Sequence, residues 1–298
     1  MLWAQREKKK MYIREILDRL RSGHLDGMNP ELKERCAKSG RDVILFGENV
    51  ERECTGIVVT CWASYEVIER AIELGANLII CHEALFWNHG DNVDWLTQEG
   101  NPVYFRKRDL LERGEITVWR DHDYMHACTP IGEGRYGDGI YYGLASQLGW
   151  LDNCYSFMGK PTMFEFRAQP FSEFLNGLLA KLNLNGARII GSRDVTVRRV
   201  YLCEHVMGKR DNAIITTMES EDIDVAIPLE LIDSTLTAYV RDSAFSGRPR
   251  AIVSLGHFNT EEPGMQWLTT WIRSMLNGAV ACTFIQSGDM FHYALRQH

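Results

Sequence analysis

The chain has 298 residues, of which 45% are hydrophobic and 24% charged, a composition that is ordinary for a folded globular protein and excludes collagen-like and largely disordered chains. Its formal net charge of −7 offers no global cationic surface to phosphates, so nucleic acid is not expected as a partner. No apolar run reaches the ~20 residues that cross a bilayer, and the basic run at residues 6–10 leads into an amphipathic helix instead of a secretory signal. We therefore expect a cytoplasmic protein without a membrane partner.

The first predicted elements form a βαβ unit behind an opening helix. Apolar residues at helical spacing predict a helix over residues 12–22, which Gly23 is expected to end. A β-rich apolar run at 56–60, a helix that begins after the N-cap Ser64, and a second apolar run at 77–81 follow with short connections. Strand, helix and strand in this order predict a parallel sheet.

The same alternation continues along the chain. A helix at 104–112, a strand at 116–119 and a helix at 140–148 complete an N-terminal α/β lobe, residues 1–155. The C-terminal lobe, residues 156–298, is predicted from strands or apolar runs at 163–167, 189, 196–203, 213–216, 224–227, 251–255 and 280–285, and from helices at 171–182, 234–246 and 263–275. Pro263 is expected at the first position of the last helix. No Pro- or Ser-rich linker separates the halves, which predicts two packed α/β lobes with mixed sheets.

The cysteines point to neither a zinc ribbon nor a redox motif. None of the eight forms a CxxC pair, and most of them have apolar neighbours. We expect reduced, buried thiols without an assigned role.

Three predicted strands are followed directly by imidazole or carboxylate side chains. These are His82 and Glu83 after residues 78–80, His122 and His126 after 116–119, and His257 and Glu261 after 251–255. Ligand sites in parallel sheets lie at the carboxyl ends of the strands, and a spacing of four places two side chains on one helical face. Together they form the donor set of a borderline divalent metal ion. The alternative is that His82 and Glu83 pair with each other or with Arg120, and that Asp121 and Asp123 lie in a solvated loop.

In order and spacing these segments resemble the fingerprint of the Nif3-like family, described as dinuclear-metal hexameric proteins and labelled GTP cyclohydrolase 1 type 2 homologues. The family carries His-His-Pro after a strand, then His-Thr-Asn-x-Asp, then Gly-His-x-x-x-Glu. The corresponding segments are residues 82–84, 122–126 and 256–261, and the resemblance extends over about residues 12–292.

The resemblance implies a site for two divalent ions, Zn, Mn, Fe, Co or Ni, between the two lobes at the carboxyl ends of the strands. Its metal ligands would be His82, Glu83, His126, His257 and Glu261, with the Glu261 carboxylate bridging the ions. Glu83 replaces a family histidine and His126 replaces a family aspartate, so the summed charge of the ligands is unchanged. Glu261 and His122 are the expected catalytic residues, with His122 behind the ligands or facing the substrate.

Two bound ions imply a metal-dependent hydrolase that acts on a small phosphorylated or amide-containing, nucleotide-like molecule. Arg120 or Arg135 would assist with an anion, while the glycines at 132–139 match no phosphate-binding pattern and indicate a flexible loop. The alternatives are a metallochaperone or regulatory metal-binding scaffold, and a metal-free interaction protein. The family also implies a ring-shaped homohexamer.

Overall fold

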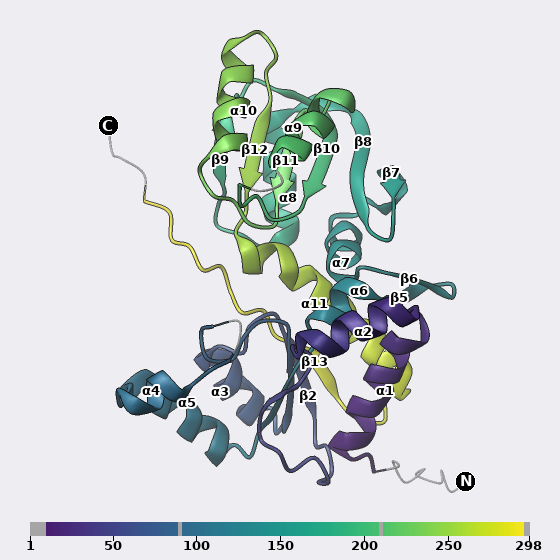
Figure 1. The fold of residues 1–298 in the computed structure, drawn as a ribbon, viewed down its shortest axis with the longest axis vertical. Helices are drawn as coiled ribbons and strands as arrows, with labels where there is room; N and C mark the ends of the chain where they lie inside the picture. Colours follow the sequence, from purple (N-terminus) through teal and green to yellow (C-terminus); the bar gives the residue numbers. More distant parts are fainter. Residues whose placement is uncertain (1–9, 89–90, 209–210, 295–298) are drawn as a thin grey trace, which may run out of the picture. The chain divides into compact units, whose positions relative to one another are not determined.

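The computed structural model describes residues 10–88, 91–208 and 211–294, and its backbone is drawn in Figure 1. Apart from Lys10, the basic run considered above lies outside the described residues. Within these three ranges, no helix combines the length and the hydrophobicity that crossing a bilayer requires.

The chain divides into two compact units. Unit 1 comprises the described residues of Met1–Gly139 and Met265–Ser287, and unit 2 those of Ile140–Gly264 and Gly288–His298. The division into lobes 1–155 and 156–298 remains a prediction about domains, because compactness alone does not show which segments fold by themselves.

Unit 1 is built on a five-stranded mixed sheet with the order β1-β4-β3-β2-β13. Its strands are β1 (Ile44–Phe46), β2 (Ile57–Thr60), β3 (Leu78–Cys81), β4 (Thr117–Arg120) and β13 (Cys282–Phe284). β13, β2, β3 and β4 run parallel and β1 is antiparallel at the edge. Every residue of β2, β3 and β4 is buried, which explains why these strands are continuous apolar runs. The predicted parallel βαβ unit is confirmed.

Helices and one hairpin complete unit 1. They are α1 (Ile13–Asp26), α2 (Pro30–Ser39), α3 (Tyr65–Glu73), α4 (Asp94–Gln98), α5 (Pro102–Arg113), α6 (Asp123–Ala127), and the paired strands β5 (Thr129–Gly132) and β6 (Arg135–Gly137). The predicted end of the first helix at Gly23 was wrong, because α1 continues to Asp26. Gly23 serves packing instead, since a Cβ there would lie 2.5 Å from Cζ2 of Trp271.

The glycine-rich segment after α6 also differs from its prediction. The expected flexible loop is an antiparallel hairpin, in which β5 pairs with β6. Gly132, Glu133 and Gly134 all have positive φ at its turn, which is the conformation that glycine adopts without strain.

Unit 2 holds a six-stranded mixed sheet with the order β7-β8-β10-β11-β12-β9. Its strands are β7 (Cys154–Phe157), β8 (Pro161–Pro170), β9 (Arg188–Gly191), β10 (Thr196–Cys203), β11 (Val225–Pro228) and β12 (Ala251–Ser254). Its helices are α7 (Gly139–Leu148), the short 3₁₀ helix η1 (Leu151–Asn153), α8 (Phe171–Leu182), α9 (Asp211–Ser220) and α10 (Thr235–Phe245). β10, β11 and β12 are parallel, whereas β7, β8 and β9 pair antiparallel.

The last helix, α11 (His257–Leu276), differs from its predicted bounds. Pro263 was expected at its first position, yet the helix begins six residues earlier and Pro263 lies inside it. A proline in a helix interior removes one backbone hydrogen bond, so sequence alone favours a start at Pro263. Residues 257–264 belong to unit 2 and residues 265–276 to unit 1.

All eight cysteines are free, and all but Cys154 are buried. Burial raises the pKa of the Cys81 thiol to about 12, so it stays protonated at neutral pH.

Candidate metal centre

In unit 1, three histidines come together where two neighbouring strands end. His82 follows β3 directly, while His122 and His126 lie at the start and end of the short helix α6, after β4. The ring of His82 stacks on that of His122, with centroids 4.5 Å apart and an interplanar angle of 12°. His126 meets both rings edge-on, at 5.0 Å from His82 and 5.2 Å from His122. One ring nitrogen from each of the three lies within 4.8 Å of the others, which suits a single ion.

The same ring nitrogen is hydrogen-bonded in all three imidazoles. Each Nδ1 faces an oxygen acceptor: the Asp121 carbonyl for His82 at 3.0 Å, Asp123 Oδ1 for His122 at 2.8 Å, and Asp138 Oδ2 for His126 at 3.2 Å. Because these oxygens accept, Nδ1 carries the proton in the neutral ring and Nε2 presents its lone pair. Metal-binding histidines in proteins are held by this kind of hydrogen bond to a carbonyl or carboxylate.

Local electrostatics keep the middle histidine neutral. Burial and the neighbouring His82 lower the pKa of His122 to about 4, although the hydrogen bond to Asp123 opposes them. Burial by itself raises the pKa of Asp123, but hydrogen bonds from His122 and Ser39 outweigh it and the net shift is downward. A neutral imidazole beside an ionised carboxylate is the state that binds a cation.

Helix α6 is held in place by a buried carboxylate upstream of β1. Asp42 Oδ1 accepts hydrogen bonds from the backbone nitrogen of His122 at 2.7 Å and of Tyr124 at 3.3 Å. Burial, followed by the charge of Asp121, raises the pKa of Asp42 to about 6. These contacts set the start of α6 and therefore the spacing of its two histidines.

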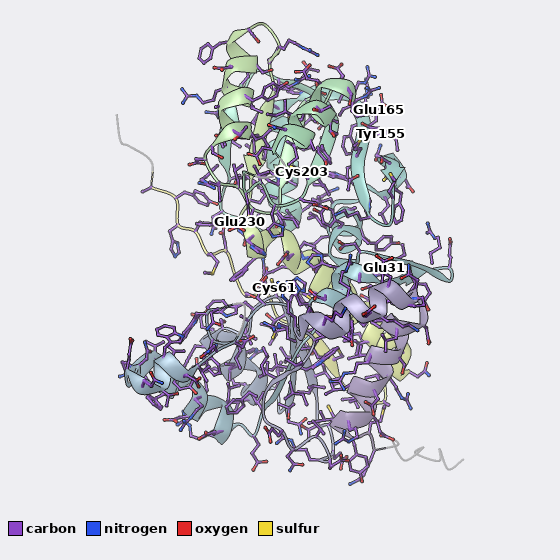
Figure 2. The ribbon with its side chains drawn as sticks, viewed as in Figure 1. Glu31, Cys61, Tyr155, Glu165, Cys203 and Glu230 are labelled. Carbon is purple, nitrogen blue, oxygen red and sulfur yellow. The ribbon has the colours of Figure 1, made fainter. Side chains whose placement is uncertain are left out.

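Unit 2 carries a second set of ligand groups, formed by His205, His257 and Glu261. Nε2 of His257 lies 3.1 Å from Oε1 of Glu261, one helical turn along α11, and the rings of His205 and His257 have centroids 5.0 Å apart. Nδ1 of His257 lies 3.7 Å from Oε2 of Glu230, which follows β11. Figure 2 labels Glu230 and Cys203, the last residue of β10, and His205 comes two residues later.

His205 is positioned by pairing between the segments after β10 and β11. The backbone nitrogen of Val206 donates to the carbonyl of Glu230 at 2.8 Å, and Val206 forms an isolated bridge with Leu231. Glu261 is fully buried, so its carboxylate is enclosed by the fold.

The structure places each predicted site residue at the end of a strand or within the helix that follows. His82 and His126 join His122 in unit 1, and His257 and Glu261 join His205 in unit 2. Glu83 is buried at the turn after β3, where its backbone nitrogen and that of His82 both donate to the Cys61 carbonyl at 2.9 Å.

The structure places the charged residues that the alternative interpretation of this segment concerned. Asp121 is fully buried and Asp123 is partly buried, so they do not form a solvated loop. Arg120 lies buried in unit 1, where it pairs with Asp91 at 2.5 Å and donates to the Arg41 carbonyl. Arg120 is the last residue of β4, and these contacts hold its side chain within unit 1.

Sequence reasoning missed His205, although it follows a predicted strand just as His82 does. It also missed His24 and Asp42, because their contacts join segments about 80 to 100 residues apart in the chain. Only the rule that ligands follow strands, applied to residues 196–203, would have found His205.

These features define an α/β protein of two compact units, each with a mixed sheet and its own set of histidine and carboxylate side chains that could bind a metal. Residues 11–114 match the family model Duf34/NIF3, NGG1p interacting factor 3. A comparison with curated proteins finds no match.

Solved structures share the fold over almost the whole chain. A Bacillus cereus protein related to NIF3 is 15% identical, with 96% of this chain and 100% of that chain covered and a TM-score of 0.68. A hypothetical protein of Staphylococcus aureus is 16% identical, with 96% and 100% covered and a TM-score of 0.65. Reduced HcgD from Methanocaldococcus jannaschii is 16% identical, with 93% and 99% covered and a TM-score of 0.62. The family match over residues 11–114 supports the predicted resemblance to the Nif3-like family, and the solved structures confirm the predicted α/β fold class.

Proposed function

We propose that this chain binds divalent metal ions through both of its ligand sets, and that it uses them as a hydrolase. The observation that carries the proposal is the orientation of His82, His122 and His126, whose Nδ1 atoms all face oxygen acceptors within 3.2 Å. Hydrogen bonds of this kind fix a ring for coordination through Nε2.

The donors fit borderline divalent ions. Unit 1 offers three imidazoles, and unit 2 offers two imidazoles and one carboxylate. Such sets suit Zn²⁺, Fe²⁺, Mn²⁺, Co²⁺ or Ni²⁺, and hard oxygen-only ions such as Ca²⁺ would be disfavoured. Glu83 remains a proposed further ligand, as the family resemblance implies.

When bound, such ions would lower the pKa of a water molecule and polarise a phosphoryl or amide oxygen. The proposed substrate is therefore a small phosphorylated or amide-containing molecule, nucleotide-like in size. Neutral His122 can accept or share a proton on the substrate side, and the enclosed Glu261 carboxylate is the proposed ligand and base. Whether the two sets share one dinuclear centre, and whether the chain assembles into a hexameric ring, remain predictions from the family resemblance.

The first experiment measures metal per chain by elemental analysis after reconstitution with Zn²⁺, Mn²⁺ or Fe²⁺ and desalting. We expect about two ions in the parent protein. We expect about one ion in the double variant His82→Ala/His126→Ala and about one in His257→Ala/Glu261→Ala. The exposed His292 belongs to neither set, so His292→Ala serves as the matched control and should keep the parent value.

The absence of stoichiometric metal from the parent, or equal metal in all four proteins, would contradict the ligand assignment. Turnover of phosphate ester and amide substrates by the loaded parent, lost in Glu261→Ala, would support the hydrolase. Readily exchanged metal without turnover of either substrate class would instead favour the metallochaperone or scaffold.

A further inference from the structure

A buried histidine outside both ligand sets makes two polar contacts at once. His24, in the last turn of α1, is fully buried, as is Asp121. Its Nε2 lies 3.1 Å from Asp121 Oδ2 and its Nδ1 lies 2.8 Å from the Cys128 carbonyl oxygen. The ring of Trp271 packs edge-on against it at 4.8 Å and holds the imidazole in this plane.

Oxygen atoms surround both ring nitrogens of His24, since Thr129 Oγ1 also lies 3.5 Å from Nδ1. A carbonyl oxygen only accepts, so Nδ1 donates to Cys128, and Nε2 shares one proton with Asp121 Oδ2. Burial by itself lowers the pKa of His24, but the charge and hydrogen bond of Asp121, with help from the Cys128 carbonyl, raise it overall. His24 and Asp121 therefore form a fully buried hydrogen-bonded pair.

The backbone of Asp121 connects this pair to the proposed metal ligands. Its nitrogen donates to the Cys81 carbonyl at 2.8 Å, which extends the pairing of β3 with β4 by one residue. Its carbonyl oxygen accepts from Nδ1 of His82 at 3.0 Å. Asp121 therefore contacts His24 through its side chain and orients His82 through its backbone carbonyl.

Stability alone does not account for a fully buried polar pair. Removing polar groups from water costs free energy that their hydrogen bond only offsets, so apolar side chains of similar size are often as stable or more so. A hydrogen-bonded pair does restrict geometry, because its hydrogen bonds allow little rotation of either side chain.

We propose that the hydrogen-bonded pair of His24 and Asp121 positions His82, so that Nδ1 of His82 stays protonated and Nε2 is turned toward the ligand set of unit 1. The proposal rests on the proposed metal binding only for its purpose, since the orientation of His82 exists without metal. Partners behind a metal ligand typically contribute about 10- to 100-fold in metal affinity.

The test compares His24→Gln, Asp121→Asn and the double variant His24→Gln/Asp121→Asn with a control. Each single variant leaves one member of the pair without its partner, whereas the double variant restores a neutral pair of amides. Leu20→Ala is the control, because Leu20 is a fully buried side chain of the same helix without a polar contact to Asp121. It should lower the Tm as much as the single variants do.

Two measurements report the positioning of His82 and do not depend on the stability of the protein. The ¹⁵N chemical shifts of the His82 ring report its tautomer in metal-free protein, and Co²⁺ titration followed by d–d absorption reports affinity and geometry. We expect the Nδ1–H tautomer in the parent and in Leu20→Ala, and a mixture of tautomers in the single variants. We expect the Co²⁺ affinity of the unit 1 set to fall about 10- to 100-fold in the single variants and to recover in the double variant.

An unchanged tautomer and unchanged Co²⁺ affinity in both single variants, with only the Tm lowered, would overturn the proposal and leave the pair purely structural. If the parent bound no Co²⁺ while the tautomer still changed in the variants, the positioning of His82 would stand. That outcome would contradict the proposed metal binding alone.

Discussion

Lys107, on α5, is 2% exposed although its side chain ends in an ammonium group. Its Nζ donates to the Leu85 carbonyl at 2.6 Å and lies 5.1 Å from the ring centroid of Trp62 and 5.6 Å from that of Phe86. Leu85 lies two residues after Glu83, a proposed ligand. Lys107 therefore anchors the segment that leaves the candidate metal centre.

Burial lowers the pKa of Lys107 to about 8, against smaller opposing effects of Cys81 and Asp91. A pKa below the unfolded value means that the folded chain binds this proton more weakly. The resulting contribution to stability is fully present above pH 10.5 and is lost as the pH falls through 8.

We expect the free energy of unfolding of the parent, relative to Lys107→Met, to rise by about 3 kcal/mol between pH 7 and pH 11. Urea unfolding at a series of pH values measures this difference. The exposed Lys33→Met is the control and should follow the parent at each pH. A constant difference between the parent and Lys107→Met would show that Lys107 titrates normally.

At the same scale, local sequence predicted several members of the two candidate ligand sets but not their partners. His82, His126, His257 and Glu261 were found because each follows a predicted strand within a few residues. The acceptors that orient the imidazoles, such as the Asp121 carbonyl, depend on backbone geometry that no pattern of residue types reveals. His24 reaches Asp121 across 97 residues of chain, and only the fold brings them together.

At the scale of elements, periodicity predicted the long helices and the buried strands well. Helix α8 has the predicted bounds 171–182, and β10 has the predicted bounds 196–203. The errors arose where packing outweighs local preference, as for Gly23 within α1 and Pro263 within α11. The three-residue strand β1 carries too few residues for a period to show.

Two helical glycines provide a matched test of packing between elements. A Cβ on Gly143 of α7 would lie 2.5 Å from the Cα of Gly264 and 2.6 Å from the Pro263 carbonyl oxygen. Both are backbone atoms of α11, which cannot move aside easily. A Cβ on Gly177 of α8 would meet no atom within 4 Å.

We expect Gly143→Ala to destabilise the protein by about 1–3 kcal/mol, because the added methyl group would overpack the contact between α7 and α11. Gly177→Ala should stabilise it by about 0.4–1 kcal/mol, because alanine restricts the unfolded chain at no steric cost. Urea denaturation of both variants measures the two changes. Equal stability of the two variants would show that the close approach of α7 and α11 is absent in solution.

At the scale of the whole molecule, chain connectivity and compact units do not coincide. The sheet of unit 1 takes β13 from residues 282–284, whereas its other four strands lie before residue 121. All six strands of the unit 2 sheet lie between residues 154 and 254. The core of unit 2 also uses Tyr141, Leu144 and Trp150, which precede its first strand.

We expect the fragment 140–264 to fold by itself and the matched fragment 156–264 not to fold. The shorter fragment lacks five buried core residues, namely Tyr141, Leu144, Ala145, Leu148 and Trp150. A large buried apolar side chain contributes about 1.5–3 kcal/mol, so the loss is comparable to the whole stability of a typical domain. Thermal unfolding followed by circular dichroism measures both fragments, and cooperative unfolding of 156–264 would instead support a boundary at residue 155.

The sequence by itself determined the α/β class, the parallel βαβ unit and the strand ends that carry the candidate ligand residues, because burial on both faces of a strand and the period of a helix are local properties. Only the tertiary structure decided that His122 stacks on His82 while His126 meets both rings edge-on, that His205 joins His257, and that β13 completes the sheet of unit 1. Each of these joins segments far apart in the chain. Their proximity follows from packing and hydrogen bonding of the folded chain, which residue spacing does not encode.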